Sequence, residues 1–123
     1  MKDSIIKDKS KNFALRIIKL YKYLTISAEN KEYVLSKQVL RSGTSIGANI
    51  KEALRGQSRP DFRAKMSIAL KEASETEYWL DLLHESEYID ESSYTSIIND
   101  NIELIKILTR IVKNTELPHY PQL

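Results

Sequence analysis

Histidine and cysteine, which often carry nucleophilic or metal chemistry, are almost missing from this sequence. It has no cysteine and two histidines, His84 in the run Asp81-Leu82-Leu83-His84 and His119 beside proline. Carboxylate-metal sites in helical bundles need two Glu-x-x-His pairs and two further carboxylates. With only these two histidines, a second ligand set cannot be built. No glycine-rich phosphate loop is present either. We therefore expect no enzyme activity, no metal and no cofactor.

Basic side chains recur along one face of residues 31–55. These residues are Lys37, Arg41, Lys51 and Arg55. In a helix with 100° per residue they lie within about 80° of arc, on the side opposite an apolar stripe. The ridge continues through Arg59 and Arg63. The first predicted helix adds Lys7, Lys9, Lys11, Lys19 and Lys22. Such a ridge can pair with phosphates without recognising a base sequence. The candidate nucleic-acid-binding residues are Lys37, Lys51, Arg55 and Arg59. A solvated face is the alternative.

Charge is divided unevenly between the two halves of the chain, although the whole has a net charge of only +2. Residues 1–71 contain 16 Lys/Arg and 6 Asp/Glu, a net +10, whereas residues 72–123 contain 3 and 11, a net −8. This asymmetry indicates either a basic face that meets a polyanion or two faces that attract each other between subunits.

Four segments with helical periodicity can position these side chains. They span about residues 4–24, 31–55, 62–84 and 90–113, and no Gly or Pro occurs between Asp61 and Leu117. In the third segment the apolar positions repeat at intervals of four and three, a heptad seam. That seam consists of Phe62, Met66, Ala69, Ala73, Thr76, Leu80 and Leu83. Short connections force neighbouring helices to be antiparallel. The predicted fold is an all-α, up-down-up-down four-helix bundle over residues 1–116, followed by a short extended tail, 117–123.

Capping residues mark the expected helix ends. Ser27 or Asn30 can cap the second helix, and Gly56 suits its C-terminus. Ser58 and Asp61 have the spacing of a capping box. An aspartate, Asp90, precedes the fourth helix.

More apolar surface is present than one bundle needs. The second predicted helix has Leu40, Gly43, Gly47 and Leu54 on one flank, and the third has three large apolar residues opposite its seam. Two glycines four residues apart in a helix each cost roughly 1 kcal/mol relative to alanine and invite a close contact. An exposed patch that contains Trp is typical of an interface, so we expect a homo-oligomer. Its predicted interface comprises Leu40, Gly43, Gly47, Leu54, Ile68, Trp79 and Leu82. The alternative is a helix buried on two sides within one bundle.

Localisation follows from what the sequence lacks. No N-terminal apolar run resembles a signal peptide, and no stretch approaches the roughly 18 apolar residues of a membrane span. The absence of cysteine fits a reducing compartment. We therefore expect a cytoplasmic protein with no membrane contact.

One stretch is less generic than the rest. It runs Leu40-Arg41-Ser42-Gly43-Thr44-Ser45-Ile46-Gly47-Ala48-Asn49-Ile50-Lys51-Glu52-Ala53. A second block runs Ile68-Ala69-Leu70-Lys71-Glu72-Ala73-Ser74-Glu75-Thr76-Glu77-Tyr78-Trp79-Leu80. Together they resemble the small bacterial proteins encoded within intervening sequences of 23S rRNA genes, a family also described as ribosomal-protein-like. The resemblance covers roughly residues 10–112.

This resemblance implies a four-helix bundle that assembles as a ring-like homopentamer. It also implies kinship with the accessory protein of diversity-generating retroelements, a basic pentamer that binds RNA and reverse transcriptase. That relative is strongly basic, whereas this chain is nearly neutral. The family has no agreed catalytic residues. The matching positions are interpreted as structural or interface residues, and they are Arg41, Ser42, Ser45, Asn49 and Glu52.

Two functional hypotheses follow. The first is a non-enzymatic, oligomeric bundle that binds RNA through its basic first half. The second is a protein-binding or self-assembling scaffold with no nucleic-acid role. The position of the basic residues separates the two, because a contiguous exposed stripe favours RNA and burial against acidic neighbours favours the scaffold.

Overall fold

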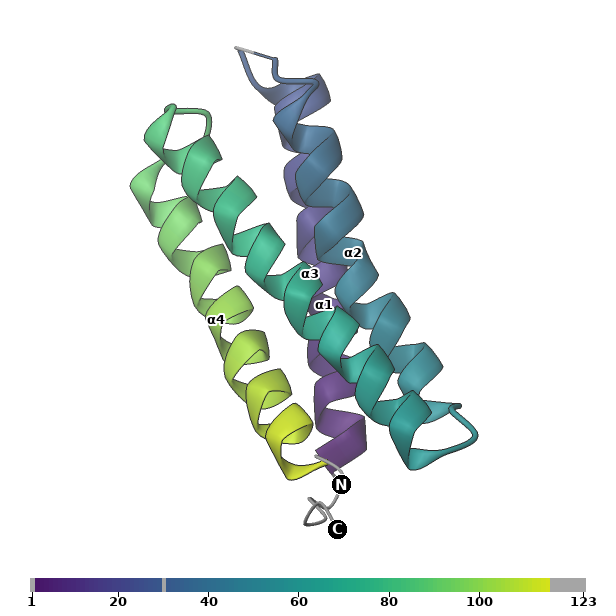
Figure 1. Ribbon diagram of the computed structural model, residues 1–123. Coiled ribbons are helices and arrows are strands. Elements are labelled where there is room, and N and C mark those ends of the chain that lie inside the picture. Colours follow the sequence, from purple (N-terminus) through teal and green to yellow (C-terminus); the bar gives the residue numbers. More distant parts are fainter. Residues whose placement is uncertain (1, 30, 116–123) are drawn as a thin grey trace, which may run out of the picture.

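Four long helices form the molecule, and a computed structural model describes residues 2–29 and 31–115. The helices are α1 (Lys2–Lys22), α2 (Leu35–Leu54), α3 (Arg59–Glu85) and α4 (Glu91–Asn114). No strand occurs within the described residues. Successive helices run in opposite directions (Figure 1), which confirms the predicted antiparallel bundle. The predicted tail, 117–123, lies outside the described residues.

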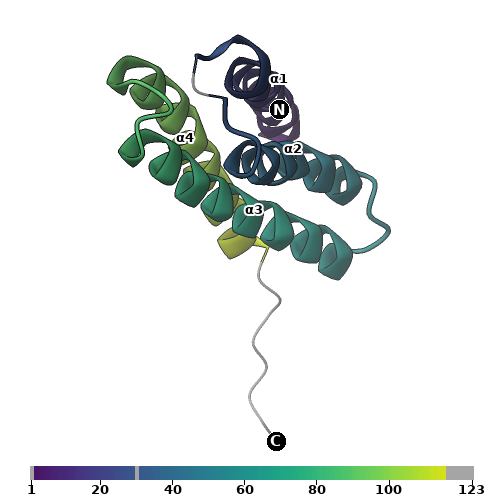
Figure 2. The same ribbon diagram turned by 90° about the horizontal axis from the view of Figure 1, so that it is seen from above.

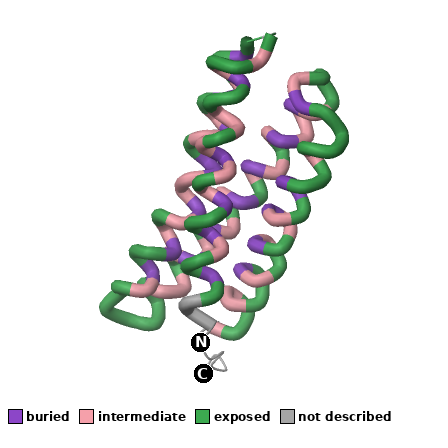
Figure 3. Tube along the Cα trace, turned by 180° about the vertical axis from the view of Figure 1, so that it is seen from behind, coloured by how far each residue is buried: buried purple, intermediate pink, exposed green. Residues whose placement is uncertain are grey.

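The bundle consists of two hairpins, α1–α2 and α3–α4, that pack on each other. Figure 2 shows the two hairpins from above, with α2 lying against α3. The most extensive helix–helix contact is between α2 and α3, and the contact between α1 and α4 is much smaller. Buried positions recur along the inward side of each helix (Figure 3), as expected for helices that share one core.

The core is aliphatic and follows the predicted stripes closely. Every predicted seam position of α3 after Phe62 is buried, and Phe62 itself packs against the core. In α4 the core is centred on Leu104 and Leu108, and the polar Asn101 is also buried. The Asn101 side-chain amide donates a 3.0 Å hydrogen bond to the Ala73 carbonyl of α3. Periodicity does not reveal such a residue, because its burial depends on a carbonyl that another helix supplies.

Two helix starts agree with their predicted caps. The Ser58 hydroxyl accepts from the Asp61 amide at 3.2 Å, and the Asp90 carboxylate accepts from the Ser93 amide at 2.7 Å. Each bond satisfies one of the amides that have no partner inside a first helical turn.

The connection between α1 and α2 differs from the prediction. α1 continues into a π-helical turn, η1 (Tyr23–Ser27), in which the Ala28 amide bonds to the Tyr23 carbonyl at 2.7 Å. α2 then begins at Leu35, so Ser27 does not cap it, and Asn30 lies outside the described residues. The cap is the buried carboxylate of Glu32, which accepts from three successive amides, those of Val34, Leu35 and Ser36, at 3.0, 3.0 and 2.6 Å.

The prediction for Gly56 needs a similar correction. α2 ends at Leu54 with Arg55 as its C-cap, and no glycine in the described residues has a positive φ. Gly56 therefore does not close the helix through a left-handed conformation. The residue that does take a positive φ is Glu87, at 67°, in the turn between α3 and α4.

Candidate nucleic-acid interface

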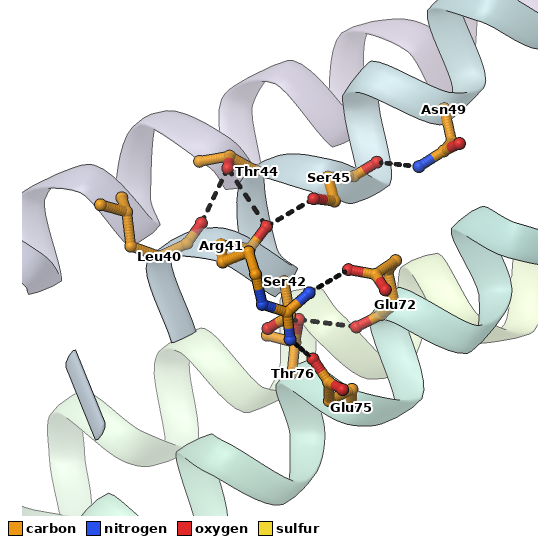
Figure 4. Close-up of polar contacts among 9 residues, drawn as sticks. All are labelled: Leu40, Arg41, Ser42, Thr44, Ser45, Asn49, Glu72, Glu75 and Thr76. Atoms are coloured by element: carbon orange, nitrogen blue, oxygen red, sulfur yellow. Dashed lines mark hydrogen bonds and ion pairs between the residues drawn. The ribbon is translucent and has the colours of Figure 1, made fainter. Parts of the chain in front are cut away.

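Arg41 leaves the basic ridge to join α2 to α3. Its guanidinium bonds to the Glu72 carboxylate at 3.1 Å and forms a second ion pair with Glu75. Figure 4 shows the side chain reaching from α2 to both carboxylates of α3. Because a planar guanidinium can bind two carboxylates at once, Arg41 serves the helix–helix contact, and its charge is balanced by acidic residues of α3.

The polar residues of the 40–53 block also serve packing (Figure 4). Ser42 and Thr76 share a buried 2.8 Å hydrogen bond between their hydroxyls. The Ser45 hydroxyl donates to the Arg41 carbonyl at 2.6 Å, and the Asn49 amide donates to the Ser45 carbonyl at 2.9 Å. These contacts support the structural interpretation of Arg41, Ser42, Ser45 and Asn49, since their polar groups are bonded within α2 or to α3.

The other cations of the α2 ridge face solvent. Lys37, Lys51 and Arg55 are exposed, and within the described ranges none of the three forms an ion pair. Arg59 is the exposed first residue of α3, beyond the turn that follows α2. The ridge is therefore shorter than predicted but open.

Close packing of α1 on α2 brings further lysines to the same face. A Cβ added to Gly43 would lie 2.8 Å from Ile17, and one added to Gly47 would lie 3.4 Å from Ser10. These contacts set the register of the antiparallel pair. By that register and the helical period, Lys7 lies level with Lys51, and Lys22 lies level with Lys37. Lys11 lies one turn from Lys7, nearer the middle of the helix pair.

We call this surface the α1–α2 basic face. It is defined by six exposed residues, namely Lys7, Lys11, Lys22, Lys37, Lys51 and Arg55. The nearest carboxylate on α2, Glu52, points towards α3, where it pairs with Lys65 at 3.1 Å. On α1, Asp8 lies at the edge remote from α2 by its helical angle. The sequence indicates that α1 contributes lysines, but it does not show which of them share a face with α2, because the register between two helices is not encoded in either one.

Not every basic residue of α1 belongs to this face. Lys9 pairs with Glu103 at 3.2 Å, and Arg16 pairs with Asp100 at 2.6 Å, both across the α1–α4 seam. Beside Arg16 the seam opens into a cleft of about 460 Å³ that Lys19, Tyr23 and Ser93 help to line. Long polar side chains thus bridge the seam where the two helices pack least.

The α3–α4 end of the bundle holds a polar cluster with shifted ionisation. The Tyr94 hydroxyl donates to Asp81 at 2.5 Å, which with partial burial raises the pKa of Tyr94 to about 12. The Tyr94 ring stacks on His84, whose Nε2 lies 2.5 Å from a Glu91 oxygen. The hydrogen bond from the Ser93 amide lowers the pKa of Asp90. Within the described residues no three His, Cys, Asp or Glu side chains are grouped so as to hold a metal.

The structure does not bring the predicted oligomer-interface residues together on one outer surface. Gly43 is buried, and the close contacts of both glycines are made with α1 of the same chain. That contact is the alternative which the sequence left open, a helix buried on two sides. Three others are half-buried against the core, and they are Leu40, Leu54 and Trp79. Leu82 is half-buried, and Ile68 is 41% exposed on α3.

Other large apolar side chains are more exposed than these. Four of them belong to the α1–α2 connection and its flanks, namely Tyr23, Ile26, Tyr33 and Val34, of which Val34 is 71% exposed. On α3, Tyr78 is 56% exposed, and its ring is tilted at 59° to the Trp79 ring, with the two ring centroids 5.2 Å apart. In the sequence, the apolar run Tyr33-Val34-Leu35 indicates this exposed surface. Periodicity instead predicts that the run lies inside the second helix.

A family model for the 23S rRNA-intervening sequence protein matches residues 2–110. The chain belongs to this family. A crystal structure of a Bacteroides thetaiotaomicron protein of unknown function, from the S23 ribosomal protein family, is 60% identical. It superposes with a TM-score of 0.88 over 92% of this chain and 99% of that one. No curated protein matches.

For this member of the 23S rRNA-intervening sequence protein family, the fold and the family resemblance predicted from residues 40–80 are both confirmed. The 40–53 block forms most of α2, and the 68–80 block forms the part of α3 that packs on it. No described helix is long and apolar enough to cross a membrane.

Proposed function

We propose that this family member is a non-enzymatic, homo-oligomeric bundle that binds RNA through the α1–α2 basic face. One observation carries the proposal. Two adjacent helices present six exposed cations on one surface, and within the described residues none of the six pairs with a carboxylate. Exposed, unpaired cations favour RNA over the scaffold hypothesis, and Arg41, which pairs with Glu72 and Glu75 of α3, is the one cation of the ridge on α2 that does not meet this condition.

Phosphate binding is the chemistry that such a face offers. Each lysine that neutralises a phosphate releases condensed counterions, so affinity falls steeply as salt rises. Lysine is a point charge on a flexible stem and does not discriminate bases. The face therefore fits the sugar-phosphate backbone better than a base sequence.

A salt titration of RNA binding tests this function. Changing Lys51→Glu and Arg55→Glu together should weaken binding and reduce the salt slope by about two, since two phosphate contacts are lost. The matched control is Lys71→Glu with Lys106→Glu, two exposed lysines of α3 and α4. Failure of the parent protein to bind RNA at low salt would remove the proposal, as would equal slopes for the two double variants.

Assembly is the second part of the proposal, and a homopentamer is what the family resemblance implies. Trp79 and Leu54 pack against the core, so charged substitutions there would unfold the subunit rather than report on assembly. Ile68→Glu and Tyr78→Glu alter exposed residues of α3 instead. We expect light scattering to show a lower mass for these variants with unchanged helix content. A monomeric parent at micromolar concentration would contradict the proposal.

A protein-binding scaffold remains the second candidate, and the exposed α1–α2 connection favours it. Apolar side chains at Tyr23, Ile26, Tyr33 and Val34 form a surface of the kind that protein partners cover. Changing Ile26→Ser and Val34→Ser should leave RNA binding intact if the basic face is the functional surface. Loss of oligomer mass in this variant, together with a parent that ignores RNA, would favour the scaffold.

A further inference from the structure

A second seam of α3 lies opposite its core seam. Its members recur at intervals of three and four, the spacing of the a and d positions of a coiled coil, and they are Ile68, Lys71, Glu75, Tyr78, Leu82 and Glu85. Glu75 and Leu82 are half-buried, and the others are exposed. We call this set the outer seam of α3. A heptad seam that is open to solvent is a surface on which another helix can pack.

A seam with the same spacing occurs on the exposed side of α1. It consists of Ile5, Asp8, Asn12, Leu15, Lys19 and Lys22, which are all exposed. Ile5 and Leu15 are each 50% exposed, although both are large apolar residues. We call this set the outer seam of α1. The molecule therefore has two uncovered seams with one periodicity.

The apolar residues of the two outer seams coincide when the helices lie parallel. Leu15 and Tyr78 each follow an isoleucine of their own seam by ten positions, Ile5 and Ile68 respectively. Placing Leu15 level with Tyr78 therefore also places Ile5 level with Ile68. At a rise of 1.5 Å per residue these two apolar contacts lie about 15 Å apart. A shift of one heptad in either direction breaks both contacts, because it puts a charged residue of α3 level with Leu15.

Opposite charges coincide in the same register. Asp8 lies level with Lys71, and Lys22 lies level with Glu85. Within the described ranges, none of these four exposed residues forms an ion pair in its own chain. Exposed ion pairs add little affinity, but complementary charges suppress wrong partners and fix the register of a contact. The apolar pairs thus provide affinity, and the charged pairs provide alignment.

The two outer seams cannot meet within one chain. α1 and α3 occupy diagonal corners of the bundle, with α2 and α4 between them (Figure 2). By the helical period each outer seam lies on the side of its helix remote from the core, so the two seams face away from each other. Both helices run in the same direction (Figure 1). Two copies that lie side by side with their long axes aligned therefore bring α1 of one copy parallel to α3 of the other.

We propose that copies of this chain assemble head to tail, with the outer seam of α1 in one copy against the outer seam of α3 in the next. This inference rests on the homo-oligomer of the proposed function and assigns its two contact surfaces. The contact is heterologous, because it joins two different surfaces, and it repeats until the assembly closes on itself. A symmetric contact between two copies of one seam would leave the exposed apolar residues of the other seam uncovered.

This contact leaves the α1–α2 basic face open except at one residue. Lys22 belongs to both surfaces, and the other five cations of the face lie outside the outer seams. Every copy in the assembly therefore still presents a basic face, and assembly and RNA binding can be tested separately.

Two double variants of the full chain each remove one seam. Ile5→Glu with Leu15→Glu alters α1, and Ile68→Glu with Tyr78→Glu alters α3, all at exposed positions. Light scattering at micromolar concentration should show a monomer for each variant alone, with unchanged helix content by circular dichroism.

Mixing the two double variants tests the head-to-tail arrangement directly. The α1 variant keeps an intact α3 seam, and the α3 variant keeps an intact α1 seam. At high micromolar concentration the mixture should therefore form a dimer with one copy of each variant and grow no further, since both remaining seams are altered. The matched control, Ile26→Glu with Val34→Glu, changes two more exposed apolar residues outside both seams and should keep the parent mass.

Charge reversal tests the register. Lys71→Glu places a carboxylate level with Asp8 and should weaken assembly roughly tenfold, because like charges then face each other. Asp8→Lys in the same chain restores opposite signs and should recover most of that loss. Lys106→Glu, at an exposed lysine of α4, is the control and should have no effect. Since Lys71 lies outside the α1–α2 basic face, Lys71→Glu should leave the salt slope of RNA binding per subunit unchanged.

The outcomes separate this inference from the proposed function. A monomeric parent would overturn the homo-oligomer and this inference together, whatever its RNA binding. An oligomeric parent would leave the homo-oligomer in place and overturn the head-to-tail contact if either double variant kept the parent mass, or if the two variants stayed monomeric when mixed. Loss of mass in the Ile26 and Val34 control would also overturn it, as would equal weakening by Lys71→Glu with and without Asp8→Lys.

Discussion

Ser42 of α2 and Thr76 of α3 share a 2.8 Å hydrogen bond between their hydroxyls, and neither residue is exposed to solvent. The Thr76 hydroxyl also lies 2.8 Å from the carbonyl of Glu72, one turn earlier in its own helix. The bond lies between the two helices with the most extensive contact in the bundle, and it joins the two sequence blocks that carry the family resemblance.

Removing one partner of this bond should cost more than removing both. Thr76→Val leaves the Ser42 hydroxyl buried without its partner on α3, which should lower the free energy of unfolding by about 1–3 kcal/mol. Ser42→Ala with Thr76→Val should recover part of that loss. Urea denaturation of the four proteins in a double-mutant cycle measures the coupling. Strictly additive single effects would show that the bond does not couple the two helices.

The two glycines of α2 should respond oppositely to alanine. A Cβ at Gly43 would lie 2.8 and 2.9 Å from the two branches of Ile17. A β-branched side chain is stiff at χ1, so Ile17 cannot easily move away. We expect Gly43→Ala to destabilise the fold by about 1–3 kcal/mol through overpacking. At Gly47 the nearest atom would be 3.4 Å away, so Gly47→Ala should gain about 0.5–1 kcal/mol of helix propensity. Thermal unfolding measures both, and equal shifts for the pair would contradict the packing argument.

Stability should decline above pH 10 because of Tyr94. Its hydrogen bond to Asp81 raises the folded-state pKa to about 12 from an ordinary value of 10.0. The folded state therefore holds the proton more tightly, and the stabilisation is complete below pH 10 and lost as the pH approaches 12. Tyr94→Phe should remove this part of the alkaline loss. Denaturation midpoints across that range measure it, and a parent and variant with parallel pH profiles would refute the assignment.

Backbone strain in the α3–α4 turn predicts a stabilising substitution. Glu87 has a φ of 67°, a left-handed conformation that glycine adopts without steric cost. Glu87→Gly should raise the free energy of unfolding by up to about 1 kcal/mol. Glu87→Ala is the control, because it removes the same charge but keeps a Cβ. A gain of equal size in both variants would assign the effect to charge instead of conformation.

Local information in the sequence was sufficient for the fold. A heptad seam needs only intervals of three and four, and a cap needs only a side chain three residues before an amide. The α3 seam and the caps at Ser58 and Asp90 were therefore predicted correctly. The cap of α2 was missed, because Glu32 caps from within a stretch that periodicity had assigned to the helix itself.

The tertiary structure alone decided which surface is open. Helical periodicity assigns each side chain an angle about its own axis, and it does not say what covers that angle. Arg41 shares the angle of Lys37 and Lys51, yet Glu72 and Glu75, more than 30 residues later, bind it. The glycines that suggested a contact between subunits bring α1 against α2 within one chain, and that register places the lysines of both helices on one face. Such contacts join residues far apart in the chain, so only packing could determine them.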